Sequence, residues 1–343
     1  MITIESLEKS LKAGNLQSIY LLYGEELFLL ENSLKRIKKI FTASVGECVK
    51  GINYISIDEN NYGEIIQDIE TPSFGYSQKL IIARNTGLLK KDGKRKNADL
   101  QKIRDRLNTY IKENIKQIKE SVILVFVEDD VDVKLELYKT LEASGIVCKF
   151  DYLKPFQIEK RVVAICKSYG VQIDGPTLKY FIDCVGTNMQ DVINEIRKLI
   201  EYAGSGGKIE KKDIDALTIR KLESIIFDLT DSLGKRDIKT ALEVLNNLIY
   251  NREPLQKILV TLYNHFKKIY FTRIAVEKNK DIIQSLKLKP NQTFLVNKYK
   301  MQARYFKKKE LERILQDLRD LDYNSKNGLI DLQIGLETII CNA

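Results

Sequence analysis

The first 150 residues alternate between short apolar runs, rich in β-branched and aromatic residues, and longer segments of helical character. This alternation predicts a parallel sheet covered by helices, because parallel strands are joined by crossover connections that are usually helical. We therefore predict an α/β domain over residues 1–150. The runs expected to form its strands are IYLLY (19–23), INYISI (52–57), KLIIA (79–83), SVILVFV (121–127) and IVCKF (146–150).

The chain from Pro155 onward has helical periodicity and no further strand-like runs. Proline suits the first turn of a helix, here predicted to run to Tyr169, and Asp174 marks a second helix start. A third helix is predicted to end in AGSGGK, whose glycines stop a helix and form a flexible joint. We predict a small helical domain over 151–208 and an all-helical bundle over 209–343.

Two apolar stripes at helical spacing characterise the predicted bundle. Such stripes normally form a core, and a groove for a partner helix is the alternative. No fixed-period repeat is evident in the sequence. The stripes consist of Leu222, Ile225, Ile226, Leu229 and Leu233, and of Leu311, Ile314, Leu315, Leu318 and Leu321.

The stretch YGEELFLLENS combines a strand end, a turn and a helix start, as nucleotide-binding folds often do. A phosphate-binding loop needs a second glycine, a lysine and a hydroxyl, but here Gly24 is followed by Glu25 and Glu26. Two carboxylates would repel phosphate, so we interpret them as complementing the dipole of the next helix. The apolar stripe of that helix is Leu27, Leu30, Leu34, Ile37 and Phe41.

Two further stretches resemble nucleotide-site motifs only superficially. GVQIDGPT (170–177) has proline where the lysine is required and follows no predicted strand, so we interpret it as a turn. VILVFVEDDV places Glu128, Asp129 and Asp130 after a buried strand, where magnesium ligands could stand. Without a phosphate loop, we expect these acids to cap a following helix over 133–143 rather than to be catalytic.

The cysteine and histidine content argues against several kinds of site. The five cysteines, scattered and odd in number, and the lone histidine, His265, argue against a disulfide scaffold, a zinc site or a histidine relay. We expect His265 to be packed or half-exposed on its helix. No apolar run reaches the ~20 residues that cross a bilayer, and no secretory signal is evident, so we expect a cytoplasmic protein.

The formal charge of +9 favours acidic partners, of which nucleic acid is the commonest. Much of this charge can equally be solvated surface. The basic segment KKDGKRKN, with Lys90, Lys91, Lys94, Arg95 and Lys96, is interpreted as an exposed loop of this kind.

Five stretches in order resemble the delta subunit family of the bacterial DNA polymerase III clamp loader, along nearly the whole chain. The resemblance implies a RecA-like AAA+ core without a functional phosphate loop, a helical lid domain and a helical collar that assembles with other subunits. The stretches are YLLYGEELFLLENSLKRI, DIETPSFGYSQKLIIARN, VGTNMQDVINEIRKLIEYAG, IFDLTDSLGKRDIKTALEVLNNLIYNREPLQKILVTLYNHFKKIY and MQARYFKKKELERILQDLRDLDYNSKNGLIDLQIGLETII.

The resemblance also implies a function and partners. Members of the family hydrolyse no ATP themselves, and they bind the beta sliding clamp and open its ring for loading onto primed DNA. The implied partners are that clamp, the gamma or tau and delta-prime type subunits of a heteropentamer, and primer–template DNA through the assembly, within a nucleoid-associated replisome. No cofactor, metal or membrane contact is expected.

The clamp-gripping element of the family is a hydrophobic tip between a helix and a strand, which matches Pro72, Ser73 and Phe74 here. Pro72 and Gly75 bracket a tight turn from which Phe74 can project, although Phe74 could also fold back onto its own domain. Related proteins often carry a second large apolar residue where this chain has Ser73, so the grip could be shared with Pro72 or Tyr76.

Two other functions remain as alternatives. An active AAA+ ATPase would bind nucleotide at Gly24, and labelled ATP would reveal it. A stand-alone DNA-binding protein would use the +9 charge and bind duplex with a steep salt dependence.

Overall fold

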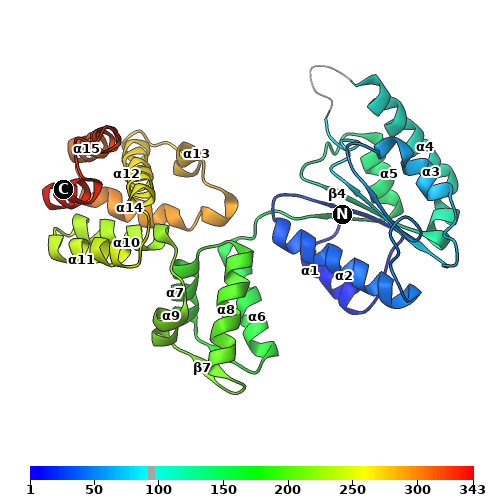
Figure 1. The fold of residues 1–343 in the computed structure, drawn as a ribbon, viewed down its shortest axis with the longest axis horizontal. Helices are drawn as coiled ribbons and strands as arrows, with labels where there is room; N and C mark the ends of the chain where they lie inside the picture. The colour runs from blue at the N-terminus through cyan, green and yellow to red at the C-terminus, as the bar shows by residue number, and fades with distance from the viewer. Residues whose placement is uncertain (92–96) are drawn as a thin grey trace. The chain divides into compact units, whose positions relative to one another are not determined.

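A computed structural model describes residues 1–91 and 97–343. The chain divides into two compact units, Met1–Tyr152 and Leu153–Ala343, and Figure 1 labels most of their helices. Lys94, Arg95 and Lys96 of the predicted exposed loop lie outside the described residues.

The first unit contains a five-stranded sheet in the order β2-β3-β4-β1-β5, with every neighbouring pair parallel. Each of the five predicted apolar runs forms one strand, and the ends differ by at most two residues. Register places Tyr23, the last residue of β1, beside Glu128, the last residue of β4. The strands are β1 (Ile19–Tyr23), β2 (Tyr54–Ile57), β3 (Lys79–Arg84), β4 (Val122–Glu128) and β5 (Ile146–Lys149).

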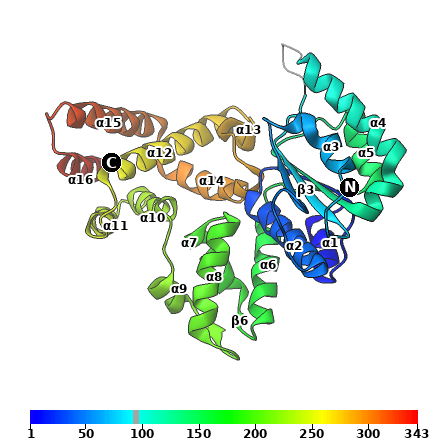
Figure 2. The same cartoon turned by 45° about the vertical axis from the view of Figure 1, so that its right-hand side comes forward.

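Helices cover both faces of this sheet. Figures 1 and 2 show α1 and α2 on one face and α3, α4 and α5 on the other. Alternate strand residues such as Leu21, Ile81 and Phe126 share a fully buried cluster with residues of α3, α4 and α5. These helices are α1 (Ile4–Lys12), α2 (Leu27–Val45), α3 (Ile65–Glu70), α4 (Ala98–Ser121) and α5 (Glu136–Ser144), with a short 3-10 turn at Tyr62–Glu64.

The predicted stripe of α2 is confirmed for four of its five residues. Leu30, Leu34, Ile37 and Phe41 are buried, as the spacing requires. Leu27 is 54% exposed, because it is the first residue of the helix and follows directly on the turn. The inclusion of Leu27 in the core was therefore wrong.

The second unit begins with the predicted helices. Lys154 precedes α6 with Pro155 in its first turn, and the Asp174 carboxylate accepts a hydrogen bond from the backbone N of Thr177 (2.8 Å) at the start of α7. The segment 170–177 leads into this helix, but residues 172–173 within it form a short strand, so the interpretation of the whole segment as a turn was incomplete. Two-residue strands β6 and β7 pair in parallel and were not predicted. The elements are α6 (Pro155–Ser168), β6 (Gln172–Ile173), α7 (Gly175–Val185), α8 (Met189–Ala203), β7 (Lys208–Ile209) and α9 (Lys211–Leu217).

The remaining helices enclose one hydrophobic core. Both predicted stripes belong to it, with Ile225 and Leu315 at its edge, and the rings of Phe266 and Phe306 meet edge to face. The elements are α10 (Leu222–Gly234), α11 (Ile238–Tyr250), α12 (Leu255–Glu277), α13 (Ile282–Leu286), a 3-10 turn (Pro290–Gln292), α14 (Leu295–Tyr305), α15 (Lys308–Lys326) and α16 (Leu332–Asn342).

The parallel sheet with helices on both faces and the helical remainder confirm the predicted fold class, an α/β core followed by helical regions. A separate boundary at residues 208 and 209 stays a prediction, because 151–208 and 209–343 fall almost wholly within one compact unit. Among the described helices, none is at once long and apolar enough to span a membrane.

His265 is a packed residue, as one of the two expectations had it. Its side chain is buried between Phe227 and Tyr299, and Nε2 lies 2.8 Å from Gln302 Oε1. The Gln302 amide donates in turn to Asp231 Oδ1 (2.7 Å). Burial lowers the pKa of His265 to about 3, so the imidazole is neutral and structural.

Candidate functional site

The segment between α3 and β3 projects one aromatic side chain into solvent. Phe74 is 90% exposed, more than any other large hydrophobic side chain in the described residues. Pro72 is also exposed and Ser73 is half-buried. Gly75 follows at φ +78°, a conformation that glycine adopts without steric cost. The alternative in which Phe74 folds back onto its own domain is therefore wrong for this structure.

The base of this tip is held by a buried lysine. Lys79, the first residue of β3, is only 2% exposed, and its ammonium donates hydrogen bonds to the backbone oxygens of Asp68 and Thr71. The backbone N and the hydroxyl of Thr71 both donate to Gln67 O, at 2.9 and 2.8 Å. These bonds fix the end of α3 to the start of β3, so that Phe74 stands on a rigid support.

The environment of Lys79 fits this structural role. A cation at the C-terminal end of a helix complements the helix dipole, and here it also satisfies carbonyl groups that the helix leaves unpaired. Burial lowers the pKa of Lys79, and burial, with the nearby Glu64 carboxylate, raises the pKa of Asp68. Sequence reasoning missed Lys79; the available signal was a lysine that opens an otherwise apolar strand.

Replacing Lys79 by methionine should loosen the tip without unfolding the domain. The two carbonyl oxygens would lose their buried donor, which costs about 1 to 3 kcal/mol for an unsatisfied group. We expect faster amide hydrogen exchange over residues 71–75 and a lower free energy of unfolding. Lys35→Met, at an exposed position of α2, is the matched control, and equal exchange in both variants would contradict this role for Lys79.

At the position of the degenerate phosphate loop, two backbone amides are engaged by carbonyl groups of the same domain. The N–H of Gly24 donates to Glu128 O (3.2 Å), and the N–H of Glu26 donates to Phe150 O (2.8 Å). These are amides of the kind that cradle phosphate in a nucleotide-binding loop. Glu26 is buried as the residue that precedes α2, and Glu25 is exposed beside it.

Gly24 has a packing reason to be glycine. Its φ is +130°, and a Cβ built there would lie 2.4 Å from Phe150 O. Real Cβ atoms do not approach a carbonyl oxygen that closely. Any side chain at position 24 would therefore clash with the backbone of Phe150, the residue that follows β5. The glycine is thus explained without a bound phosphate.

Glu128 is a buried carboxyl group rather than a helix cap. Its Oε1 accepts hydrogen bonds from the backbone N (3.1 Å) and the hydroxyl (2.9 Å) of Thr86, and Oε2 has no partner in the described structure. Burial raises the pKa of Glu128 to about 7. The expectation that Glu128, Asp129 and Asp130 cap the next helix is wrong, because α5 starts only at Glu136, after an extended Leu135.

Glu128→Gln should stabilise the protein increasingly as the pH rises. The folded-state pKa lies near 7 and the ordinary value is 4.5, so Glu128 supports folding below pH 4.5 and loses that contribution as the pH rises through about 7. Glutamine keeps an acceptor for Thr86 but cannot ionise. We expect a gain of about 1 to 3 kcal/mol at pH 8 and little change at pH 5, measured by urea unfolding. The exposed Asp130→Asn is the control, and equal pH dependence of Glu128→Gln and the parent chain would refute the assignment.

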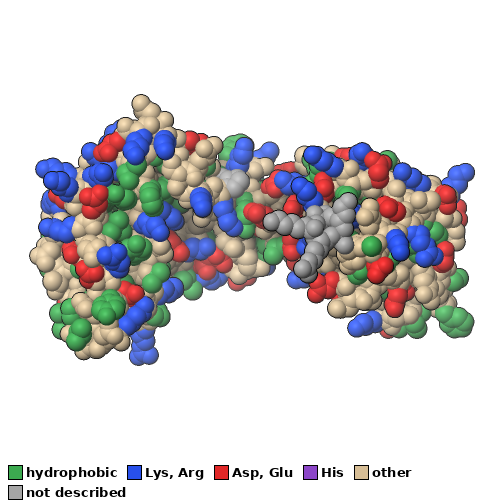
Figure 3. All heavy atoms as spheres, turned by 90° about the horizontal axis from the view of Figure 1, so that it is seen from above, with side chains coloured by type: hydrophobic (Ala, Val, Ile, Leu, Met, Phe, Trp, Pro, Cys, Tyr) green, Lys and Arg blue, Asp and Glu red, His purple; other side chains and the backbone are tan. Residues whose placement is uncertain are grey.

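Exposed apolar side chains also occur on the helices of the C-terminal region. Figure 3 shows hydrophobic side chains at the surface of this unit, and we call five of the exposed residues the collar patch. They lie on the ends of α11 and α15, on the connection between α15 and α16, and on α16, which packs against both other helices. The collar patch consists of Tyr250, Tyr323, Leu329, Ile330 and Ile334.

Comparison with known proteins gives consistent results. A model described as DNA polymerase III, delta subunit, matches residues 20–151, and a model of the C-terminal domain of the same subunit matches 223–343. The DNA polymerase III subunit delta of Bacillus subtilis is 27% identical over 337 residues, covering 97% of this chain and 94% of that protein. The probable DNA polymerase III subunit delta of Aquifex aeolicus is 26% identical over 320 residues, covering 90% and 86%.

A solved structure agrees over the whole length. The Bacillus subtilis DNA clamp loader delta protein superimposes with a TM-score of 0.75 at 25% identity, covering 99% of this chain and 98% of that one. The two family models and this structure together span both units described above.

Proposed function

The chain belongs to the family of DNA polymerase III delta subunits, and on that premise we propose that it binds the ring-shaped sliding clamp through Phe74 and opens one clamp interface. The observation that carries the proposal is the 90% exposure of Phe74 on a turn whose base is fixed by Lys79. A phenylalanine held in water is costly unless a partner receives it.

The free energy gained by burying Phe74 is large enough to make it a binding hot spot. Burying a phenylalanine side chain contributes about 1.5 to 3 kcal/mol through apolar area. An aromatic residue that is held rigidly before binding loses little entropy when it docks. Pro72 is exposed beside Phe74, and Ser73 and Tyr76 are half-buried, so Pro72 and Tyr76 can add to the grip where Ser73 contributes little apolar surface.

In this proposal, the first unit supports the Phe74 tip and transmits force to the clamp, but it neither binds nor hydrolyses ATP. The backbone N–H groups of Gly24 and Glu26 already donate hydrogen bonds to backbone carbonyl groups, and the buried Glu128 carboxyl group accepts hydrogen bonds from Thr86. These contacts support a subunit that hydrolyses no ATP. ATP is then bound by sister subunits.

Assembly with those subunits is assigned to the C-terminal helices. The collar patch offers apolar side chains for contacts with the gamma or tau and delta-prime type subunits of a heteropentamer. Primer–template DNA is contacted through the completed assembly, in keeping with the charge of +9. The site of action is the replisome on the nucleoid.

A pull-down with the cognate sliding clamp tests the proposal. The purified chain should retain the clamp without nucleotide, and added Mg·ATP should not change the amount retained. Retention that depends on ATP would indicate an active ATPase, and failure to retain the clamp under either condition would refute clamp binding.

A further inference from the structure

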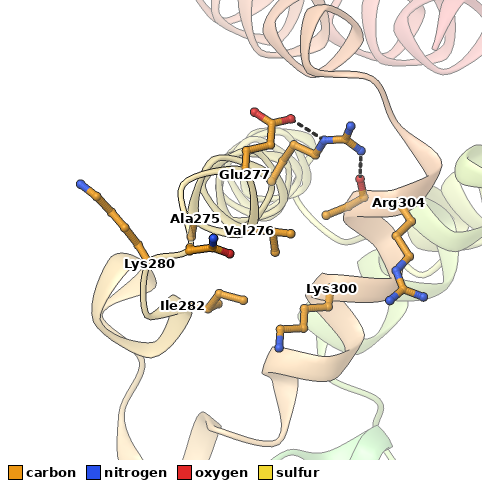
Figure 4. A pocket seen from close by; sticks show the side chains of 10 residues that line it. Ala275, Val276, Glu277, Lys280, Ile282, Lys300 and Arg304 are labelled. Atoms are coloured by element: carbon orange, nitrogen blue, oxygen red, sulfur yellow. Dashed lines mark hydrogen bonds and ion pairs between the residues drawn. The ribbon is translucent and has the colours of Figure 1, made fainter.

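A hollow of about 630 Å³ lies in the C-terminal helical region, among residues of the second unit. It is formed by the end of α12, the turn into α13 and the facing side of α14, and α12 packs against both of the other helices. Aliphatic side chains contribute its apolar surface, and Figure 4 shows Val276 and Ile282 facing the space between the helices. The aliphatic residues are Ala275, Val276, Ile282 and Ala303.

The rim of this hollow is basic. Lys280, Lys300 and Arg304 line it, and all three are exposed. Within the described ranges, none of the three is engaged in an ion pair. Figure 4 shows Lys280 and Arg304 on opposite sides, with Lys300 extending between them.

The other charged groups that line the hollow neutralise one another. The Arg273 guanidinium donates to Glu277 Oε1 (2.9 Å) and to Ala303 O (3.1 Å), contacts drawn as dashed lines in Figure 4. Glu277 is the one carboxylate in the described lining. The hollow therefore keeps three uncompensated positive charges above an aliphatic floor.

This combination selects a ligand that is both acidic and apolar. Bases of single-stranded nucleic acid normally stack on aromatic side chains, and the described lining contains none. An apolar side chain of a peptide can fill an aliphatic hollow while neighbouring carboxylates meet the lysine and arginine side chains. The charge complementarity and the aliphatic floor thus favour a peptide over a nucleic acid.

We propose that the hollow bounded by Val276, Ile282, Lys300 and Arg304 is a docking site for a short acidic segment of a partner protein, with one apolar side chain seated on the floor. The site lies outside the clamp-binding tip, and the proposal does not depend on clamp binding.

Fluorescence anisotropy with the full chain tests this site. The probe is a fluorescein-labelled peptide of four aspartates followed by Leu-Phe, and a second peptide carries Ser-Ser in place of Leu-Phe. We expect saturable binding of the first peptide that weakens with salt, and binding of the second that is several-fold weaker. The double variant Lys300→Glu/Arg304→Glu should bind the first peptide at least about tenfold more weakly.

Lys309→Glu makes the same type of charge change at an exposed position of α15 and should bind like the parent chain. Val276→Ser tests the floor and should weaken only the peptide that ends in Leu-Phe. Equal binding of both peptides, or no loss in the double variant, would overturn the proposal. Preferential binding of a fluorescein-labelled oligothymidine, lost in the double variant, would overturn it in favour of a nucleic-acid site.

Discussion

Phe74→Ala should weaken binding to the cognate sliding clamp by about 2 to 4 kcal/mol, which corresponds to roughly 30- to 700-fold in the dissociation constant. The substitution removes the aromatic ring that a clamp pocket would bury. The free chain should keep its stability, because Phe74 is 90% exposed and supports little of its own domain. Isothermal titration calorimetry with the purified clamp measures the affinity, and thermal unfolding checks the fold.

The matched control for this experiment is Phe156→Ala. Phe156 is also an exposed phenylalanine, 72% accessible, but it lies at the start of α6 in the second unit. It should leave clamp affinity unchanged within a factor of about two. If Phe74→Ala binds the clamp as tightly as Phe156→Ala does, the tip is not the anchor.

Gly24→Ala should destabilise the protein by about 2 to 5 kcal/mol, since the strained backbone and the steric clash both add to the cost. The new Cβ would lie 2.4 Å from Phe150 O, and the backbone at φ +130° disfavours any side chain. Relief requires the ends of β1 and β5 to move apart at a point where both Gly24 and Phe150 are buried. Urea unfolding of the purified chain measures the change in the free energy of unfolding.

Gly46→Ala separates the two contributions. Gly46 also has a positive φ, +87°, but a Cβ there would meet no atom within 4 Å. It should cost only about 1 kcal/mol, the backbone part alone. A Gly24→Ala variant no less stable than Gly46→Ala would show that the close approach to Phe150 does not explain the glycine.

The sheet could be predicted from the sequence because parallel strands buried on both faces are continuous apolar runs. All seven residues of β4 are buried, and the first six are apolar, so the run is uninterrupted up to Glu128 at its end. The two-residue strands β6 and β7 were beyond prediction, because such short pairs have no periodicity and depend on the tertiary approach of distant segments.

The residues of the candidate site could also be predicted only in part. The position of Phe74 followed from a proline and a glycine that bracket a turn, together with the family resemblance, and its exposure was decided by the tertiary structure. Lys79 and Glu128 were missed or misassigned because charged residues are usually exposed. Lys79 is buried because it satisfies two carbonyl groups at the end of α3, and Glu128 because Thr86 donates to it.

We propose that this chain opens the clamp without nucleotide chemistry of its own. Spin labels placed on both sides of one interface of the cognate clamp, with the distance between them measured by pulsed electron resonance, provide the decisive test. We expect the distance to increase when this chain is added without nucleotide, and to stay unchanged when the Phe74→Ala variant is added. A distance that stays constant with the parent chain, or that increases only when ATP is added to the two proteins, would rule out opening by this chain alone.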